Sequence, residues 1–143
     1  MNIVVGAIVF KENKILMVKE TKKECYGKWA FPAGHLEENE SILEGVIRET
    51  KEETGCDIQL KKVFPIITTN KNIIMIHILA ELINDTNEYD RSEIMETKWI
   101  DVEQLKKMKE ESLRSYPVVN LIINSLEEKR LYELDIIQNL KKL

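Results

Sequence analysis

The stretch from Gly34 to Cys56 constrains this chain more than any other part of its sequence. It reads GHLEENESILEGVIRETKEETGC, and its glycines and charged residues stand at fixed offsets. A helix over residues 41–54 brings three glutamates to one face, because residues three and four apart are neighbours on a helix. These glutamates are Glu49, Glu52 and Glu53. Three carboxylates so close repel one another unless a cation lies among them, so the segment predicts a helix face that holds a positive ion.

The same helix has an apolar stripe that predicts how it packs. At about 100° per residue, the residues expected to face a sheet are Ile42, Leu43, Val46, Ile47 and Thr50. Gly45 falls between the carboxylates, where it leaves room for the metal cluster or for the preceding loop. Arg48 is placed to orient Glu52 or to offset its charge, and Gly55 sits where a helix terminator belongs.

The other elements predict a mixed sheet flanked by helices. The expected strands cover residues 2–10, 14–19, 57–67, 72–82 and 98–100, with a short apolar segment at 29–31. The expected helices cover residues 41–54, 102–108 and about 117–128, the second of them capped by Asp101. Loops are expected at residues 21–28 and 84–91. At 143 residues, this order fits one domain over residues 1–143.

Oxygen-only donors on the acidic face favour a hard cation, Mg²⁺ or alternatively Mn²⁺. Mg²⁺ binds a few carboxylates and completes its shell with water and substrate phosphate. A solvated acidic surface is the alternative, because RETKEE alone is a common surface pattern. The full spacing over the whole stretch favours the metal site over that alternative.

That spacing resembles the box of the Nudix (MutT-like) hydrolase superfamily, G-x5-E-x7-R-E-U-x-E-E-x-G-U, in which U is a bulky apolar residue. The matching charged and glycine positions are Gly34, Glu40, Arg48, Glu49, Glu52, Glu53 and Gly55. The two U positions hold Thr50 and Cys56, which are weak matches and put local packing in doubt rather than metal binding. The resemblance implies an α/β (α+β) fold, the Nudix-type α/β/α sandwich with a mixed β-sheet between helices.

The resemblance also implies an enzyme, which hydrolyses a phosphoanhydride bond with Mg²⁺ and a metal-activated water. Its metal ligands would be Glu49, Glu52 and Glu53, joined by a downstream acid for which Glu96 is the candidate. Glu93 is a weaker candidate for that downstream position. Glu52 and Glu53 are both candidates for the general base, as is a downstream acid. Arg48 would act in the catalytic site mainly as an organiser.

Motifs outside the box are similar to a bacterial Nudix phosphatase branch that acts on nucleoside tri- and diphosphates and on thiamine pyrophosphate compounds. They are VKET (residues 18–21), WAFPAGHLE (29–37), LRSYP (113–117) and RLYEL (130–134). The expected substrate-binding residues are Gly34, His35, Glu40, Arg114 and Ser115. The alternatives are a structural role for His35, a solvent-exposed Arg114 and a capping Ser115. His77 is expected in the core or on a sheet face.

Other substrates stay open, and so does another class of protein. An oxidised-nucleotide pyrophosphohydrolase and a hydrolase of dinucleoside polyphosphates, nucleotide sugars or capped RNA share the same chemistry. A non-catalytic ligand-binding regulator would be expected to lose box carboxylates, and none is missing. A small phosphorylated metabolite or nucleotide is the expected partner, because the net charge of −4 disfavours a nucleic-acid polymer.

The remaining sequence features concern location and assembly. No apolar run approaches the roughly 18 residues that span a bilayer, and the N-terminus does not read as a signal peptide. Cys25 and Cys56 are expected to be reduced in a cytoplasmic protein. The apolar segment VVNLIINSL of the last helix offers a surface for a homodimer.

Overall fold

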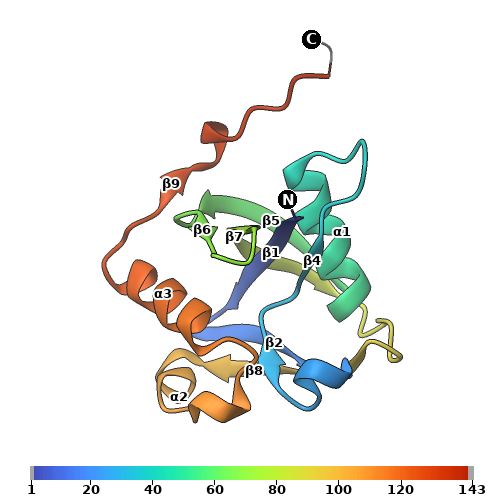
Figure 1. Cartoon of the computed structure of the whole chain (residues 1–143), viewed down its shortest axis with the longest axis vertical. Coiled ribbons are helices and arrows are strands. Elements are labelled where there is room, and N and C mark those ends of the chain that lie inside the picture. The colour runs from blue at the N-terminus through green and yellow to red at the C-terminus, as the bar shows by residue number, and fades with distance from the viewer. Residues whose placement is uncertain (1, 142–143) are drawn as a thin grey trace.

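The computed structural model describes residues 2–141 and shows one mixed sheet with helices on both faces (Figure 1). The strands are β1 (Asn2–Lys11), β2 (Lys14–Glu20), β3 (Trp29–Ala30), β4 (Ala33–His35), β5 (Cys56–Val63), β6 (Ile67–Thr68), β7 (Ile73–Asp85), β8 (Ile94–Asp101) and β9 (Tyr132–Glu133). The helices are α1 (Ile42–Thr54), α2 (Val102–Lys106) and α3 (Tyr116–Glu127). The order β3-β2-β1-β7-β5-β9 is extended by β4 on β1, β6 on β7 and β8 on β2. Strands β1 and β7 run parallel, and the other pairs are antiparallel.

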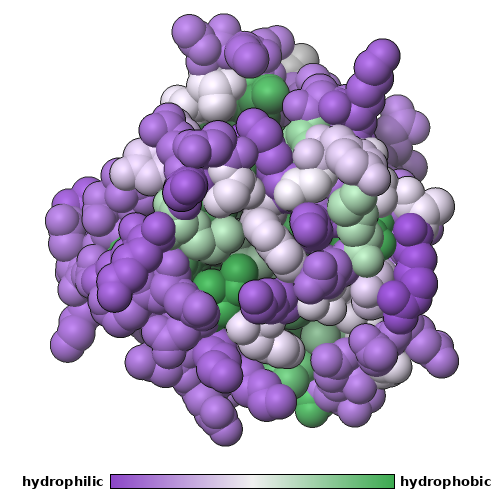
Figure 2. All heavy atoms as spheres, turned by 90° about the horizontal axis from the view of Figure 1, so that it is seen from below, coloured by the Kyte–Doolittle hydropathy of each residue, from purple (hydrophilic) through white to green (hydrophobic). Residues whose placement is uncertain are grey.

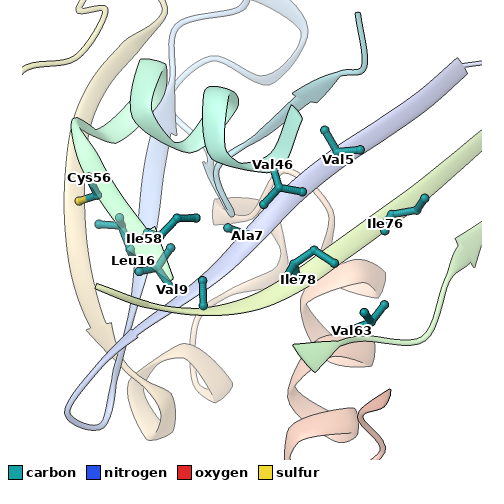
Figure 3. Close-up of a cluster of buried hydrophobic side chains, with 11 residues drawn as sticks. Val5, Ala7, Val9, Leu16, Val46, Cys56, Ile58, Val63, Ile76 and Ile78 are labelled. Atoms are coloured by element: carbon teal, nitrogen blue, oxygen red, sulfur yellow. The ribbon is translucent and has the colours of Figure 1, made fainter. Parts of the chain in front are cut away.

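Each face of this sheet has its own apolar core, because side chains along a strand alternate between the two faces. On one face Val46 of α1 lies against Val5 of β1 and Ile78 of β7 (Figure 3). On the other face Ile8 of β1 packs in a cluster that includes Ile122 of α3. These layers confirm the predicted sandwich.

Helix α1 ends at the predicted Gly55 signal and begins at Ile42, one residue after the predicted start, because Ser41 is its cap. Ser41 and Glu44 form a reciprocal capping box, with both hydrogen bonds at 3.2 Å. Gly55 closes the helix with a φ of 74°, a left-handed conformation that suits glycine. Thr50 is buried as expected, but the prediction for Ile47 was wrong, since this residue is 45% exposed. The helix packs against β4 as well as β1. Because of this second contact, its buried side includes Glu53, and Ile47 is left exposed to solvent.

Three predicted strands have different bounds in the structure. The segment 57–67 divides into β5 and β6, because Pro65 between them has no N–H to donate to a strand ladder. Strand β8 begins at Ile94 rather than at residue 98 and pairs along most of β2. Strand β7 extends to Asp85, into the predicted loop. Beyond the last helix, β9 pairs with β5 in a segment for which no strand was predicted.

Within residues 2–141, no helix has both the length and the apolar character needed to cross a membrane. Cys25 and Cys56 are both buried, with free thiols. On the face drawn in Figure 2, hydrophilic side chains separate small groups of apolar residues. That face offers no broad apolar surface for self-association, and the homodimer stays a prediction.

Candidate active site

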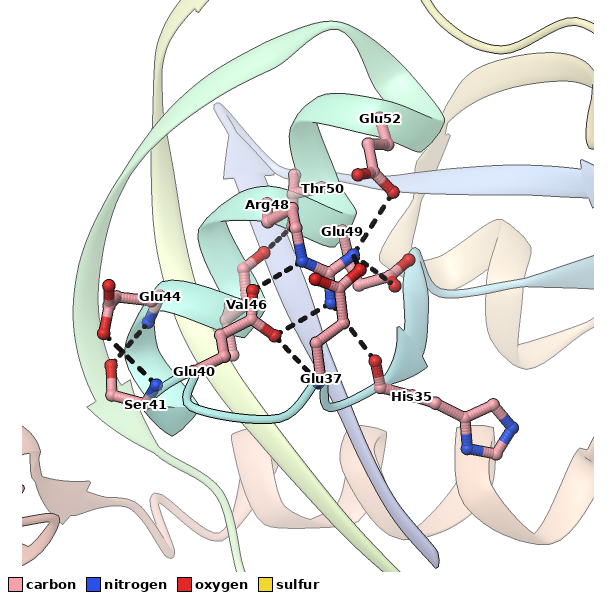
Figure 4. Close-up of polar contacts among 10 residues, drawn as sticks. All are labelled: His35, Glu37, Glu40, Ser41, Glu44, Val46, Arg48, Glu49, Thr50 and Glu52. Atoms are coloured by element: carbon pink, nitrogen blue, oxygen red, sulfur yellow. Dashed lines mark hydrogen bonds and ion pairs between the residues drawn. The ribbon is translucent and has the colours of Figure 1, made fainter.

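Arg48 lies at the centre of a cluster of glutamates on the outer side of α1 (Figure 4). Its guanidinium donates to Glu40 through Nε at 2.5 Å and through Nη2 at 2.9 Å. Nη1 donates to Glu49 at 2.8 Å and to Glu52 at 3.3 Å. Nη2 also donates to the backbone carbonyl of His35 at 3.1 Å. Arg48 therefore ties the acidic face of α1 to the loop that precedes it.

Glu40 is held by this network. Both its oxygens accept from Arg48, and Oε1 also accepts from the backbone N–H of Glu37 at 3.1 Å. The hydrogen bond from Arg48 lowers the pKa of Glu40, so the carboxylate stays ionised. Gly45 leaves room for this loop, because a Cβ there would lie 2.8 Å from Leu36 and 3.0 Å from the Glu40 carboxylate. The contacts give Glu40 a positioning role, and its predicted contact with substrate stays a prediction.

Glu49 lies against the backbone of β4. A Cβ at Gly34 would stand 2.2 Å from the carboxyl carbon of Glu49 and 2.3 Å from each of its oxygens. Only glycine at this position lets the carboxylate approach so closely. Burial raises the pKa of Glu49, and the hydrogen bond from Arg48 opposes that shift.

Glu53 is the most deeply buried of the box carboxylates, with 4% of its surface exposed. Oε1 accepts from the backbone N–H of Ala33 at 2.9 Å. Burial raises the pKa of Glu53 to about 8, and the nearby carboxylates of Glu20 and Glu49 add to the shift. The side chain of Glu52, by contrast, is 51% exposed to solvent.

Glu20, at the end of β2, is a site residue that the sequence reasoning missed. It is 2% exposed, and its Oε1 accepts from Nη1 of Arg114 at 3.1 Å. Its Oε2 is buried without a hydrogen-bond partner among the described residues. The sequence signal is a glutamate two residues after the apolar run ILMV, which does not reveal a partner 94 residues away.

A cavity of about 180 Å³ lies between the sheet and the start of α3. It reaches the carboxylates through β4, because its lining includes Ala33, which donates to Glu53, and Gly34, which lies against Glu49. Its walls include Gly34, His35, Met75, His77, Lys22, Arg114, Ser115 and Val119. Ser115 also caps α3 by accepting from the backbone N–H of Val118 at 3.4 Å. The structure thus brings Arg114 and Ser115 to one cavity with Gly34. The His35 ring is exposed and turned away from the Arg48 cluster (Figure 4).

His77 is buried on a sheet face, as predicted, and it also forms part of the cavity wall. Burial lowers its pKa to about 4, so the ring is neutral at physiological pH. Its Nδ1 has no hydrogen-bond partner among residues 2–141. The rings of His77 and Phe31 pack edge to face, with 6.2 Å between their centroids. One residue of the cavity wall therefore has a buried ring nitrogen without a hydrogen-bond partner among the described residues.

The downstream acids lie in different surroundings. Glu93 adds to the negative field at Glu49 and shares an open cleft with Glu52. Glu96 is exposed in β8, in register with Lys19, and the described contacts do not bring it to the box carboxylates. Its predicted role as a metal ligand stays a prediction, and Glu93 has the more favourable position.

Comparisons with known proteins agree with this geometry. A model of the NUDIX domain matches residues 2–121. The chain belongs to the Nudix family. The phosphatase NudJ of Shigella boydii serotype 4 is 33% identical over 144 residues, which cover 95% of this chain and 90% of that protein.

Two further Nudix relatives extend the comparison. The 8-oxo-dGDP phosphatase NUDT18 of Danio rerio is 54% identical over 57 residues, which make up 39% of this chain and 18% of the relative. The chain thus matches less than a fifth of that protein's length. A solved NUDIX hydrolase from Nitrosomonas europaea superposes with a TM-score of 0.85 at 25% identity, covering 97% of each chain. These matches make the chain a Nudix hydrolase.

Nudix hydrolases generally use a divalent metal, and the residues of this site fit one. Within the part of the chain described, no three acidic, histidine or cysteine side chains already converge as a ligand set, since Arg48 stands between Glu49 and Glu52. The donors are nevertheless all carboxylates, which suit a hard cation. The buried Glu53 and the unpartnered oxygen of Glu20 are groups whose charge a cation would compensate.

We expect the stability of the metal-free protein to depend on Glu53. Its pKa rises from 4.5 to about 8 on folding, so between these values the folded state holds a proton that the unfolded state releases. The free energy of unfolding then falls by up to about 1.4 kcal/mol per pH unit as pH rises through that window. Urea unfolding of wild type and Glu53→Gln, with chelator at pH 5.5 to 8.5, isolates this contribution. Parallel stability curves for the two proteins would contradict it.

Proposed function

We propose that this Nudix hydrolase uses Mg²⁺ to cleave a phosphoanhydride bond in a small nucleoside di- or triphosphate or a thiamine-pyrophosphate-like metabolite. The observation that carries the proposal is the buried Glu53, with Glu49 packed beside it against Gly34. Burying carboxylates is costly unless a positive charge compensates them. In a hydrolase, a divalent cation can supply that charge and bind the substrate phosphate at the same time.

The proposed ligands are Glu49, Glu52 and Glu53, and Mn²⁺ would suit the same oxygen donors. A metal held by these residues would supply Lewis-acid chemistry: polarisation of a phosphoryl oxygen and a lower pKa for a bound water. Arg48 keeps Glu49 and Glu52 in place through its hydrogen bonds. We assign the general base to Glu52 rather than Glu53, because Glu52 is half exposed and can exchange a proton with water.

The cavity supports a substrate with a ring attached to its phosphates. Apolar side chains of β7 and α3 form much of its wall, while Lys22 and Arg114 contribute cationic groups. A heterocycle in contact with Met75 and Val119 would direct its phosphates toward Gly34 and the box carboxylates. The neutral His77 would offer a hydrogen-bonding group to that ring. The buried free thiols suit a reducing compartment, so we propose a cytoplasmic enzyme.

Two relatives favour different substrates within this class. Similarity to the phosphatase NudJ extends over nearly the whole of both proteins, and it supports release of orthophosphate. Similarity to an 8-oxo-dGDP phosphatase is higher in identity but limited to 57 residues. We therefore propose a phosphatase of small pyrophosphate compounds and keep oxidised nucleoside diphosphates as the second candidate.

A substrate panel tests the proposal. Purified protein with Mg²⁺ is incubated with nucleoside di- and triphosphates, 8-oxo-dGDP, thiamine pyrophosphate, ADP-ribose, diadenosine polyphosphates and capped RNA. We expect orthophosphate from the di- and triphosphates and from thiamine pyrophosphate, with no turnover in chelator. Pyrophosphate as the main product from triphosphates would contradict the phosphatase assignment. Binding of the panel without turnover would instead indicate a ligand-binding regulator.

A further inference from the structure

Glu20 is directed into the protein by a local irregularity of the sheet. The register between β2 and β8 shifts between Lys19 and Glu20. Such bulges redirect side chains and are common beside active sites. The backbone on either side is fixed, because the Glu20 N–H donates to Lys28 at 2.9 Å and its carbonyl accepts from Gly27 at 2.8 Å. The position of the Glu20 carboxylate is therefore built into the fold.

This carboxylate is only half compensated. Arg114 donates to Oε1, whereas Oε2 is buried and has no partner among the described residues. A buried charge is stable only when its hydrogen bonds are satisfied. Glu20 also adds to the negative field at Glu53, so the two carboxylates act on one region. The negative charge beside Glu53 therefore includes Glu20, a residue outside the box.

Arg114 connects this region to the cavity. Its side chain is 40% exposed and contributes to the cavity wall with Lys22 and Ser115. Its backbone N–H donates to Trp29 at 2.9 Å, which fixes the start of the side chain. A guanidinium has five N–H groups, and its fork suits phosphate as well as carboxylate. The same group can therefore serve Glu20 or a phosphate oxygen in the cavity.

We propose that Glu20 and Arg114 form an exchange pair that couples cation binding to phosphate binding. The proposal rests on the proposed function, because it assumes that a cation and a phosphate meet at this site. Without ligands, Arg114 pairs with one oxygen of Glu20. With a cation among the carboxylates, Glu20 no longer needs Arg114, which then donates to the phosphate. By thermodynamic linkage, phosphate strengthens cation binding by the same factor.

Phosphate binding by the metal-free protein provides the test. Inorganic phosphate is titrated into the protein with chelator and followed by ³¹P NMR. Glu20→Gln should bind phosphate about 10-fold more tightly than wild type, within the usual range of such couplings. The double variant that combines Glu20→Gln with Arg114→Gln should show no such gain in phosphate affinity. Glu24→Gln, with the same charge change at an exposed neighbouring position, should bind like wild type.

Equal phosphate affinity in wild type and Glu20→Gln would overturn the exchange pair, as would a gain that persists without Arg114. Should Glu20→Gln fold poorly, Arg114→Gln alone still decides. It should leave metal-free phosphate binding unchanged and weaken binding in Mg²⁺, whereas equal losses in both conditions contradict the proposal. These measurements need no turnover, so they succeed or fail independently of the substrate panel.

Discussion

Replacing Glu53 by Gln should lower kcat/KM by about 10³-fold or more and leave the protein folded. A metal ion contributes several kcal/mol of transition-state stabilisation, and each 1.4 kcal/mol corresponds to a factor of ten in rate. Gln keeps the size of the side chain and can still accept from the Ala33 N–H. It removes the negative charge that a cation requires. The measurement is steady-state kinetics in saturating Mg²⁺, with the thermal midpoint recorded for each variant.

Two comparisons separate a metal role from a general loss of charge. Glu38→Gln makes the same change at an exposed loop position and should retain wild-type turnover. Calorimetric titration with Mg²⁺ should show weakened binding in Glu53→Gln and unchanged binding in Glu38→Gln. Wild-type turnover in both Glu53→Gln and Glu52→Gln would show that the metal-site assignment is wrong.

The parts of the fold that depend on local sequence were predictable. The helix limits follow from Ser41, Glu44 and Gly55, whose roles are set within a few residues of the chain. The grouping of Glu49, Glu52 and Glu53 follows from helical spacing alone. The mixed sheet and the order of its main elements follow from runs of apolar residues and the turns between them.

The remaining features depend on tertiary contacts that local patterns do not encode. Ile47 belongs to the apolar stripe by spacing, but β4 packs on α1 and rotates the buried side away from it. Glu20 reads as an ordinary strand end until Arg114 is placed beside it. His77 was placed correctly on a sheet face, yet the cavity next to it arises only when α3 packs over β7.

The close contact between Gly34 and Glu49 was also beyond sequence reasoning, which named Gly34 as a box position and as an expected substrate-binding residue. In the structure the glycine makes space for a carboxylate. We expect Gly34→Ala to lower kcat/KM about 10²-fold, because a displacement of about 1 Å in a reacting group has that effect. The protein should stay folded, since the atoms that must move are the end of a flexible side chain. Kinetics together with thermal unfolding measure both effects.

Gly6→Ala is the informative contrast, because its Cβ would stand 2.7 Å from the carbonyl oxygen of Pro32, a backbone atom that cannot rotate away. That variant should lose stability, whereas Gly34→Ala should mainly lose activity. Shortening the displaced side chain separates the causes further. In a Glu49→Asp background, Gly34→Ala should lower kcat/KM little beyond the loss caused by Glu49→Asp alone. Two changes that act through one carboxylate are not additive. Fully additive losses would show that Gly34 acts on the loop backbone and not through the position of Glu49.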